Sequence, residues 1–295
     1  MKVPLISVVV LTYNQFEQTT RPCLDSLRPW YGDPYIEFIV YDNDSPDGSR
    51  EKTKKWCERF PAIQFVEGTT NLGYAGGMNA AAKFASGEWL YLVNNDTEFP
   101  AAALDALKHV LHTAKPEIGM IGPVTNSAGN GQRLYDPSKT KQEWLDLGEW
   151  LHQNPTNVLI PTYRCDFFCI AIRRSVWVQL NGLDTAFGPG YYEDFDFSLR
   201  LRQAGHEQSI TEDVFIYHQG SATFRQSNRL KQLIRRNKKT LVQRHPKAKF
   251  LHARVCNLIV LKNPPYSNET TENGPIRIRK QIRVNALKKI PQKAY

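Results

Sequence analysis

Short apolar runs alternate with segments of helical period along the first 124 residues. The apolar runs are residues 6–11, 36–41, 63–66, 89–93 and 118–124. The helical segments between them are residues 16–27, 49–60, 76–85 and 101–113. Strands that alternate with helices of this length are typical of βαβ units, which place parallel strands in one sheet between helices. The pattern therefore predicts an α/β fold with a mainly parallel sheet flanked by helices.

The pattern weakens between residues 125 and 163, where Gly, Asn, Pro and charged residues dominate. We expect an insertion or mobile loop region there, next to the functional site. Regular structure is expected to return with an ordered segment, two helices and a short strand that ends at His218. These elements are residues 167–173, 175–180, 195–204 and 214–217.

The C-terminal part of the chain has a different character. Residues 228–244 have the spacing of a basic amphipathic helix, and Pro264, Pro265 and residues 267–274 have the composition of a linker. Residues 276–295 are basic with interleaved Ile, Val and Leu. We therefore expect a body, residues 1–225, that is followed by a basic helical C-terminal extension, residues 226–295.

Charge is distributed unevenly over the 295 residues, whose net charge is +9. Residues 225–295 hold 19 Lys and Arg but only two acids, whereas residues 1–224 hold 19 basic and 27 acidic residues. Basic tails bind nucleic acid, anionic lipid headgroups or acidic partners. Few aromatic residues accompany the charges of the tail, and no zinc or helix-turn-helix motif is present, which argues against nucleic acid.

Five scattered cysteines argue against a disulfide framework and favour a reducing compartment. The first apolar run lacks a small-residue cleavage site, so we interpret it as a strand and not as a signal peptide. No apolar run approaches the roughly 20 residues that span a bilayer. These features predict a cytoplasmic protein.

The fourth apolar run leads directly into Asn94, Asn95, Asp96 and Thr97. A carboxylate at the end of a strand can hold Mg²⁺ or Mn²⁺ beside a diphosphate, because these ions take oxygen ligands and leave positions for phosphates. His218 would complete such a site more readily for Mn²⁺ than for Mg²⁺. The alternatives are a helix N-cap for Asp96 and a purely structural histidine.

A second acidic cluster follows a Gly-Pro-Gly-Tyr-Tyr segment. Glu193, Asp194 and Asp196 stand where this segment enters a predicted helix. Acids there stabilise a helix N-terminus, or one of them acts as a general base at the mouth of a site. The two tyrosines and the glycines before the acids indicate a shaped pocket, which favours the general base.

Five motifs occur in a fixed order: V-V-V-L-T-Y-N, I-V-Y-D-N-D-S-P-D-G-S, N-L-G-Y-A-G-G-M-N-A-A, Y-L-V-N-N-D-T and Y-Y-E-D-F-D-F-S-L-R-L-R-Q-A-G-H. Together they resemble the family 2 glycosyltransferases of the GT-A fold, over about residues 5–245. The chain is similar to bacterial rhamnosyltransferase-like and galactofuranosyltransferase-like members. This resemblance implies a nucleotide-sugar half at 1–124 and an acceptor half at 125–225.

The resemblance also implies roles for individual residues. Leu11, Thr12 and Tyr13 would lie against the nucleotide base, and Asp42 would contact the pyrimidine ring nitrogen. The remaining nucleotide-sugar contacts would come from Asn71, Gly73, Asn79, Asn94 and Asn95. Asp96 and His218 would bind the metal, Mn²⁺ or Mg²⁺, although the family often has two or three acids where this chain has N-N-D. Asp194 would be the base that accepts the acceptor's proton, with Glu193 in support.

The activity that the resemblance implies is inverting transfer from a UDP- or dTDP-sugar, such as a rhamnose-type deoxysugar, galactose, galactofuranose or glucose. The acceptor would be a hydroxyl of a growing cell-surface polysaccharide or lipid-linked oligosaccharide. The spacing of basic and apolar residues after Asn263 suits a helix that lies on the anionic inner face of the plasma membrane, and a disordered tail or a dimer contact are the alternatives. A sugar nucleotidyltransferase is the main enzymatic alternative, but it needs a Gly-rich, basic loop after the first strand, where this chain has T-Y-N-Q-F-E-Q. A glycosyltransferase-like domain that binds without catalysis is a further alternative.

Overall fold

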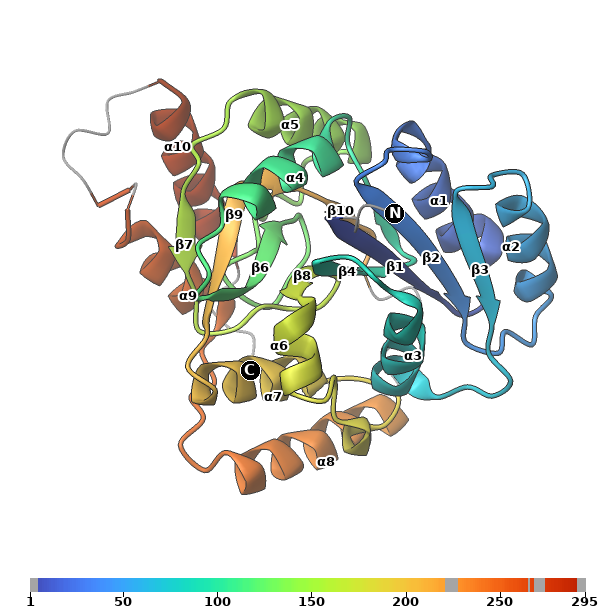
Figure 1. The fold of residues 1–295 in the computed structure, drawn as a ribbon. Coiled ribbons are helices and arrows are strands. Elements are labelled where there is room, and N and C mark those ends of the chain that lie inside the picture. Colours follow the sequence, from blue (N-terminus) through green and yellow to red (C-terminus); the bar gives the residue numbers. More distant parts are fainter. Residues whose placement is uncertain (1–4, 221–227, 265, 268–273, 291–295) are drawn as a thin grey trace.

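One eight-stranded sheet forms the centre of the computed structural model, which describes residues 5–220, 228–264, 266–267 and 274–290 (Figure 1). The strand order is β3-β2-β1-β4-β8-β6-β9-β7. The strands are β1 (Ile6–Thr12), β2 (Ile36–Asp42), β3 (Ile63–Glu67), β4 (Trp89–Asn94), β6 (Ile118–Val124), β7 (Leu159–Pro161), β8 (Cys169–Arg173) and β9 (Glu207–Phe215). Only β8 and β7 run antiparallel to their neighbours in this sheet, so the predicted mainly parallel α/β fold is confirmed.

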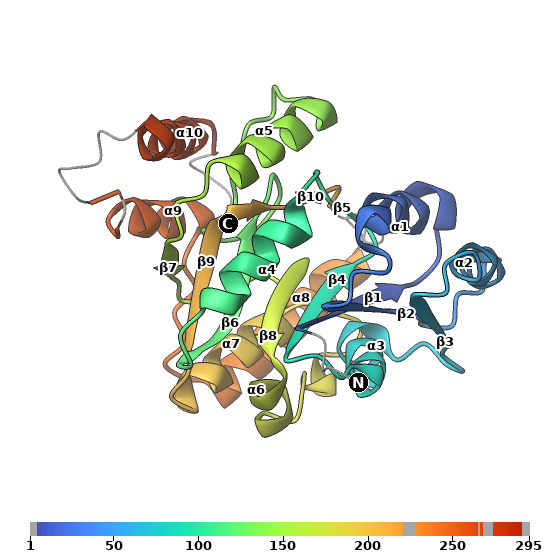
Figure 2. The same ribbon diagram turned by 45° about the horizontal axis from the view of Figure 1, so that its top comes forward.

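Side chains of the central strands alternate between two hydrophobic cores because successive residues of a strand point to opposite faces. Val8 and Val10 of β1 belong to one core, whereas Val9 and Leu11 belong to the other. Helices α1 (Arg21–Leu27), α2 (Ser49–Cys57) and α4 (Ala103–Thr113) cover the first face, and α3 (Gly73–Ala81), α6 (Arg174–Gln179) and α7 (Glu193–Gln203) cover the second (Figures 1 and 2).

Shorter elements connect these layers. The predicted helix at 16–27 is a π-helical turn, η1 (Phe16–Thr20), followed by α1. The 3₁₀ turns are η2 (Arg28–Trp30), η3 (Ala82–Phe84) and η4 (Thr185–Phe187). Two further strands, β5 (Thr97–Glu98) and β10 (Tyr217–His218), pair antiparallel outside the main sheet.

The expectation of an insertion or mobile loop at 125–163 is wrong for much of that segment. It contains the helix α5 (Lys141–Gln153) and the edge strand β7. Thr140 and Glu143 form a reciprocal capping box at the start of α5. Helix α5 continues through Gly148 and packs on Pro100 at this residue. A Cβ there would lie 2.6 Å from the proline ring, so the close contact requires glycine.

The predicted strand at 214–217 covers only the end of β9, which begins at Glu207, and part of β10. Strand β9 does not look apolar in sequence because it contains the acids Glu212 and Asp213, although both are buried in the structure. Helix α9 (Ala253–Leu261) was not predicted, whereas α8 (Asn228–Arg244) was; α10 (Gly274–Lys289) lies in the basic segment. Most of the predicted linker, the boundary at 225/226 and Lys293 lie outside the described residues.

Helix α10 packs on the body through two arginines, so these two side chains do not face lipid. Arg279 and Arg283 are 1% and 0% exposed. Arg279 lies 3.1 Å from Asp213, and Arg283 forms an ion pair with Glu212. Lys280 donates to the carbonyl of Tyr266. Among the described residues, no helix is both long and apolar enough to cross a membrane.

Candidate active site

A cavity of about 1680 Å³ opens at the carboxyl ends of β1 and β4. These adjacent parallel strands are the point where the strand order changes direction, because β2 follows β1 on one side and β4 lies on the other. Ligands of open α/β sheets bind at such a switch point. Leu11 at the end of β1 is paired in register with Asn94 at the end of β4, so the residues that follow both strands reach one cavity.

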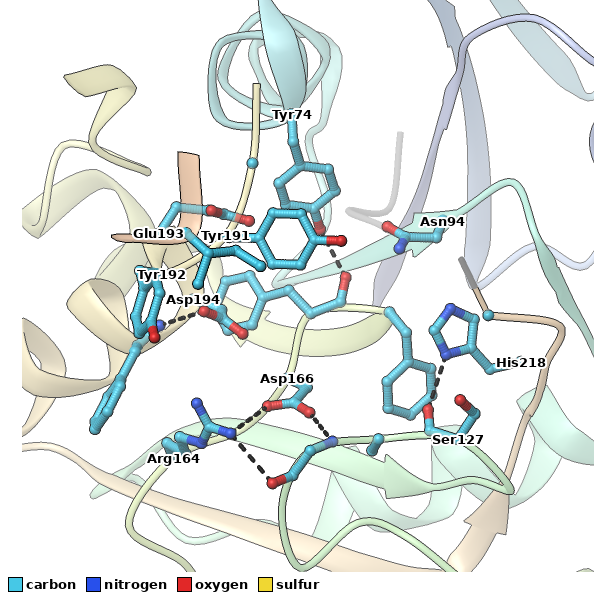
Figure 3. Close-up of a pocket in the computed structure, with 18 of the residues that line it drawn as sticks. Tyr74, Asn94, Ser127, Arg164, Asp166, Tyr191, Tyr192, Glu193, Asp194 and His218 are labelled. Atoms are coloured by element: carbon cyan, nitrogen blue, oxygen red, sulfur yellow. Dashed lines mark hydrogen bonds and ion pairs between the residues drawn. The ribbon is translucent and has the colours of Figure 1, made fainter. Parts of the chain in front are cut away.

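Asp96 and His218 lie together although 122 positions separate them in the sequence, because the short β5–β10 ladder pairs His218 with Thr97. The Nε2 atom of His218 is 3.4 Å from Oδ1 of Asp96. The His218 ring stacks on Phe168, with 5.2 Å between ring centroids, and its Nδ1 is 2.9 Å from the carbonyl of Ser127 (Figure 3). The predicted pair is therefore brought together at the cavity.

The donor set at this end of the cavity fits a divalent metal. The Asn94 Oδ1 atom is buried and has no hydrogen-bond partner among the described residues, and Asn94 lines the cavity with Asp96 and His218. A carboxylate, an amide oxygen and an imidazole suit Mn²⁺ better than Mg²⁺. The described part of the chain contains no group of three His, Cys, Asp or Glu that could hold a metal, and phosphate oxygens or water would supply the further ligands of such an ion.

Asp96 also controls the charge of His218. Burial lowers the His218 pKa, but the hydrogen bond and the negative charge of Asp96 more than offset burial, and the pKa is raised above its ordinary value. A metal ligand must be the neutral imidazole. Metal binding at this pair would therefore displace a proton and become weaker at acidic pH.

Glu193 and Asp194 open helix α7 and line the cavity on the side away from Asn94 and His218 in Figure 3. Glu193 is 6% exposed, and its Oε2 has no hydrogen-bond partner among the residues described. Burial, with the charge of Asp194 added, raises the Glu193 pKa to about 8. Asp194 accepts a 2.7 Å hydrogen bond from the backbone N–H of Phe195. Burial and Asp166 raise its pKa to about 6, against the opposing effect of Arg164.

Asp166 and Arg164, which lie outside the five motifs, and Tyr74, which lies in the third motif but had no expected role, also line the cavity (Figure 3). Asp166 lies 3.6 Å from Arg164 and accepts hydrogen bonds from the backbone of Gly129 and from Asn130. Tyr74 donates a 2.7 Å hydrogen bond to the carbonyl of Phe167. Arg164 and Asp166 stand outside any recognisable motif, so only their proximity to Asp194 in space indicates their importance.

The structure separates the predicted nucleotide-sugar residues into two groups. Those that line the cavity are Leu11, Tyr13, Asn71, Gly73, Asn94 and Asn95. Thr12, Asp42 and Asn79 lie outside its lining, within the part of the chain that is described. Asn79 bonds through both amide atoms to the backbone of Leu183, at 2.7 and 2.8 Å, and so ties α3 to the segment before η4.

The carboxylate of Asp42 does not face the cavity. Its residue exposure is 0%, and its oxygens accept hydrogen bonds from the backbone and hydroxyl of Ser45, from Arg50 and from Thr12. The expected contact with a pyrimidine ring is thus not available in this arrangement. The neighbouring Asn43 does line the cavity, and it bonds to Asn71 and to the backbone of residues 72 and 73.

The C-terminal extension contributes part of the cavity wall. Ile234 and Lys238 of α8 line it, as do residues 250–253. The ammonium of Lys238 lies 5.0 Å from the centroid of the Phe250 ring, and Tyr192 meets the same ring edge-on. The site is therefore closed by residues from both the body and the extension.

Comparison with known proteins gives one family. The sequence model described as "Glycosyl transferase family 2" matches residues 7–178, a range that includes Asp96 but ends before Glu193, Asp194 and His218. The uncharacterised protein y4gI of Sinorhizobium fredii is 25% identical over 75% of this chain, which spans 25% of the relative. The O-antigen biosynthesis protein RfbC of Myxococcus xanthus is 27% identical over 75% of the chain, which spans 18% of RfbC. The chain therefore spans only about a quarter or less of these relatives.

Solved structures share the fold at low sequence identity. The mannosyltransferase PcManGT from Pyrobaculum calidifontis, in complex with GDP-Man and Mn²⁺, superposes with a TM-score of 0.54 at 17% identity, covering 97% of this chain and 86% of that one. TarS from S. aureus, in complex with UDP, also gives a TM-score of 0.54 at 17% identity, with coverages of 90% and 73%.

Proposed function

The chain belongs to glycosyl transferase family 2, and from this premise we propose that it is an inverting enzyme that uses a UDP- or dTDP-sugar. The acceptor in this proposal is a hydroxyl of a cell-surface polysaccharide or lipid-linked oligosaccharide. One observation carries the proposal: a carboxyl group with a pKa of about 6, Asp194, lines the same cavity as the Asp96–His218 pair.

Asp194 has the properties of the general base. A pKa of about 6 leaves its carboxylate mostly ionised at neutral pH, yet basic enough to take a proton. As the acceptor oxygen attacks the anomeric carbon, its proton passes to Asp194 and the bond between that carbon and the diphosphate oxygen breaks. Glu193, whose pKa is about 8, stays mostly protonated and adds no second negative charge beside the base.

Asp96 and His218, with Asn94, would hold Mn²⁺ at the opposite wall. When bound, the metal would neutralise charge on the departing diphosphate. Asn95 would keep this segment in place, since its amide donates to the hydroxyls of Thr19 and Thr20 at 3.1 and 2.9 Å. The mannosyltransferase that binds GDP-Man with Mn²⁺ and the TarS complex with UDP support a nucleotide-sugar donor.

The identity of the donor base is part of the proposal. Since Asp42 is enclosed by Ser45 and Arg50, recognition of the base would rest on Leu11, Tyr13, Asn43 and Asn71 at the cavity wall. These groups supply amides and apolar surface, which suit a stacked base with few direct hydrogen bonds. The O-antigen role of RfbC supports a polysaccharide acceptor.

We place the proposed contact with an anionic membrane surface at exposed residues of α9 and at the start of α10. Val255, Leu258 and Ile259 of α9 are 40–43% exposed, and Ile278 of α10 is 47% exposed next to the exposed Arg277. Such a mixture of apolar and basic side chains suits the interface of an anionic bilayer. Sedimentation with anionic vesicles tests it: the Leu258→Asp, Ile259→Asp variant should pellet less than the wild type, and equal pelleting would contradict it.

A thermal-shift panel of nucleotide sugars tests the proposed function directly. UDP-, dTDP- and GDP-sugars are compared with and without Mn²⁺, since a ligand that binds only the folded state raises Tm. One UDP- or dTDP-sugar should raise Tm, and Asp96→Ala should remove the contribution of Mn²⁺. Stabilisation by nucleoside triphosphates alone would favour a nucleotidyltransferase, and stabilisation by no nucleotide sugar would refute the proposal.

A further inference from the structure

The loop that delivers Glu193 and Asp194 to the cavity has an unusual backbone. Tyr191 and Tyr192 both have positive φ values, 73° and 77°, directly before the first residue of α7. Gly188 and Gly190 in the same loop have φ values of 71° and 151°. Large side chains disfavour this region, and such a conformation persists only where the surrounding structure holds it.

One side chain of α8 bonds to this loop at three points. Asn237 is 0% exposed, and its Nδ2 lies 2.6 Å from the carbonyl of Phe187 and 2.9 Å from those of Gly190 and Tyr191. The Nε of Arg236 donates to Oδ1 of Asn237 at 3.0 Å, which fixes the amide with its nitrogen toward the loop. The Nη2 of Arg236 also donates to the carbonyl of Phe187, at 3.2 Å.

Helix α3 limits the loop from another side. The N–H of Tyr74 donates to the carbonyl of Pro189 at 3.4 Å, and a Cβ on Gly73 would lie 2.8 Å from the carbonyl oxygen of Gly188. Helix α8 itself is fixed against α7, since His245 lies 2.9 Å from Asp196 and both are buried. Figure 1 shows α8 beside α7 below the sheet. The loop is therefore held between α3 and α8.

We propose that Asn237 is a positioning residue of the active site: it holds residues 187–192 in the conformation that directs Asp194 into the cavity. This inference rests on the proposed function. It assigns part of the catalytic geometry to the C-terminal extension, which lies beyond the residues that the family model matches. Asn237 acts through the loop and touches no reacting atom.

Asn257 provides a matched control. Among the described residues of the extension it is also 0% exposed, and it bonds to Ala253, to Arg283 and, at 3.5 Å, to the carbonyl of Asn130, but to none of residues 187–192. Asn237→Leu and Asn257→Leu both replace a buried amide by an apolar side chain of similar size. Only the first should release the loop.

Two measurements separate positioning from general support of the fold. Asn237→Leu should lower kcat by about 100-fold, the effect of a displacement of roughly 1 Å, with the donor KM changed by no more than about threefold. Asn257→Leu should keep kcat within about threefold even if it unfolds at a lower temperature. Equal losses of kcat in the two variants, or an Asn237→Leu effect on KM alone, would overturn the proposal.

Hydrogen exchange tests the inference independently of any reaction. In the protein without substrate, amides of residues 188–196 should exchange faster in Asn237→Leu than in the wild type and Asn257→Leu. Unchanged exchange there would overturn the inference even if the wild type is an active glycosyltransferase. Faster exchange together with an inactive wild type would refute the proposed function and leave the role of Asn237 in the loop standing. If Asn237→Leu does not fold, Asn237→Asp, which keeps the shape of the side chain, replaces it at pH 8.

Discussion

Glu193→Gln tests the electrostatics of the active site without any substrate. Glu193 is 6% exposed, and burial, followed by the charge of Asp194, raises the pKa of its carboxyl from an ordinary value of 4.5 to about 8. The position at the N-terminus of α7 opposes this shift, because a helix N-terminus favours negative charge. The helix N-terminus contributes about 0.3–2 kcal/mol. One pKa unit corresponds to about 1.4 kcal/mol, and the shift from 4.5 to about 8 spans several units, so the effect of burial is the larger one.

The direction of the pH dependence follows from which state holds the proton. Between pH 4.5 and 8 the unfolded chain has lost the Glu193 proton and the folded protein retains it. The folded state binds more protons in this window, so the free energy of unfolding falls as the pH rises, by up to about 1.4 kcal/mol per unit. Gln cannot ionise and does not carry this cost. Relative to the wild type, Glu193→Gln should gain on the order of 3 kcal/mol of stability between pH 5 and pH 8.

Urea unfolding at pH 5, 6.5 and 8 measures the effect, with wild type, Glu193→Gln and the exposed control Glu58→Gln compared at each pH. The difference between Glu193→Gln and wild type should grow steadily with pH, and Glu58→Gln should follow the wild type. A difference that is the same at all three pH values would show that Glu193 ionises normally in the folded protein. The distinction drawn between the two carboxyl groups would then fail.

Three further changes test other parts of the structure. Asp194→Asn should lower the rate of sugar transfer by about 10²–10⁴-fold and leave nucleotide binding intact. The wild-type rate should rise with pH through about 6 as Asp194 ionises. If Asp194→Asn is active and Glu193→Gln is inactive, Glu193 is the base instead. Asp96→Ala should lower donor hydrolysis and transfer by about 100-fold or more, and near-normal rates with or without Mn²⁺ would contradict the metal site. Arg283→Met leaves Glu212 buried without its ion-pair partner, so the free energy of unfolding should drop by about 3–5 kcal/mol, and a wild-type urea midpoint would disprove the pairing.

The sequence predicts the fold of residues 1–124 well because local patterns determine it. The strands β1, β2 and β4 are mainly apolar and almost entirely buried, with Ser7 in β1 and Glu37 in β2 among their polar residues. Asp96 comes two residues after the end of β4, so its place at the sheet edge could be predicted. Helix α5 was also predictable in principle, since Thr140 and Glu143 have the spacing of a capping box. Its Gly148 suggested a loop, but here glycine allows a close helix contact.

Other features depend on partners that are distant in the sequence. Glu212 and Asp213 make β9 look like a polar segment, yet they are buried because Arg283 and Arg279 meet them from α10. Ser45 and Arg50 are close to Asp42 in the sequence, but only the structure shows that their side chains bond to its carboxylate. In the same way, the arginines of α10 look like a lipid-binding pattern until their partners are known. Long-range charge pairing therefore accounts for the main errors.

The loop at residues 187–192 connects the C-terminal extension to the cavity. Two tyrosines with positive φ cost roughly 1–3 kcal/mol each. The two N–H groups of the Asn237 amide are shared among the carbonyls of Phe187, Gly190 and Tyr191, and at about 0.5–1.5 kcal/mol for each hydrogen bond they offset part of that strain. Without α8 the loop would keep its contacts with α3 but lose those with Asn237, so Asp194 would be held less firmly in the cavity. Loss of α8 would also change the cavity itself, because Ile234 and Lys238 line it.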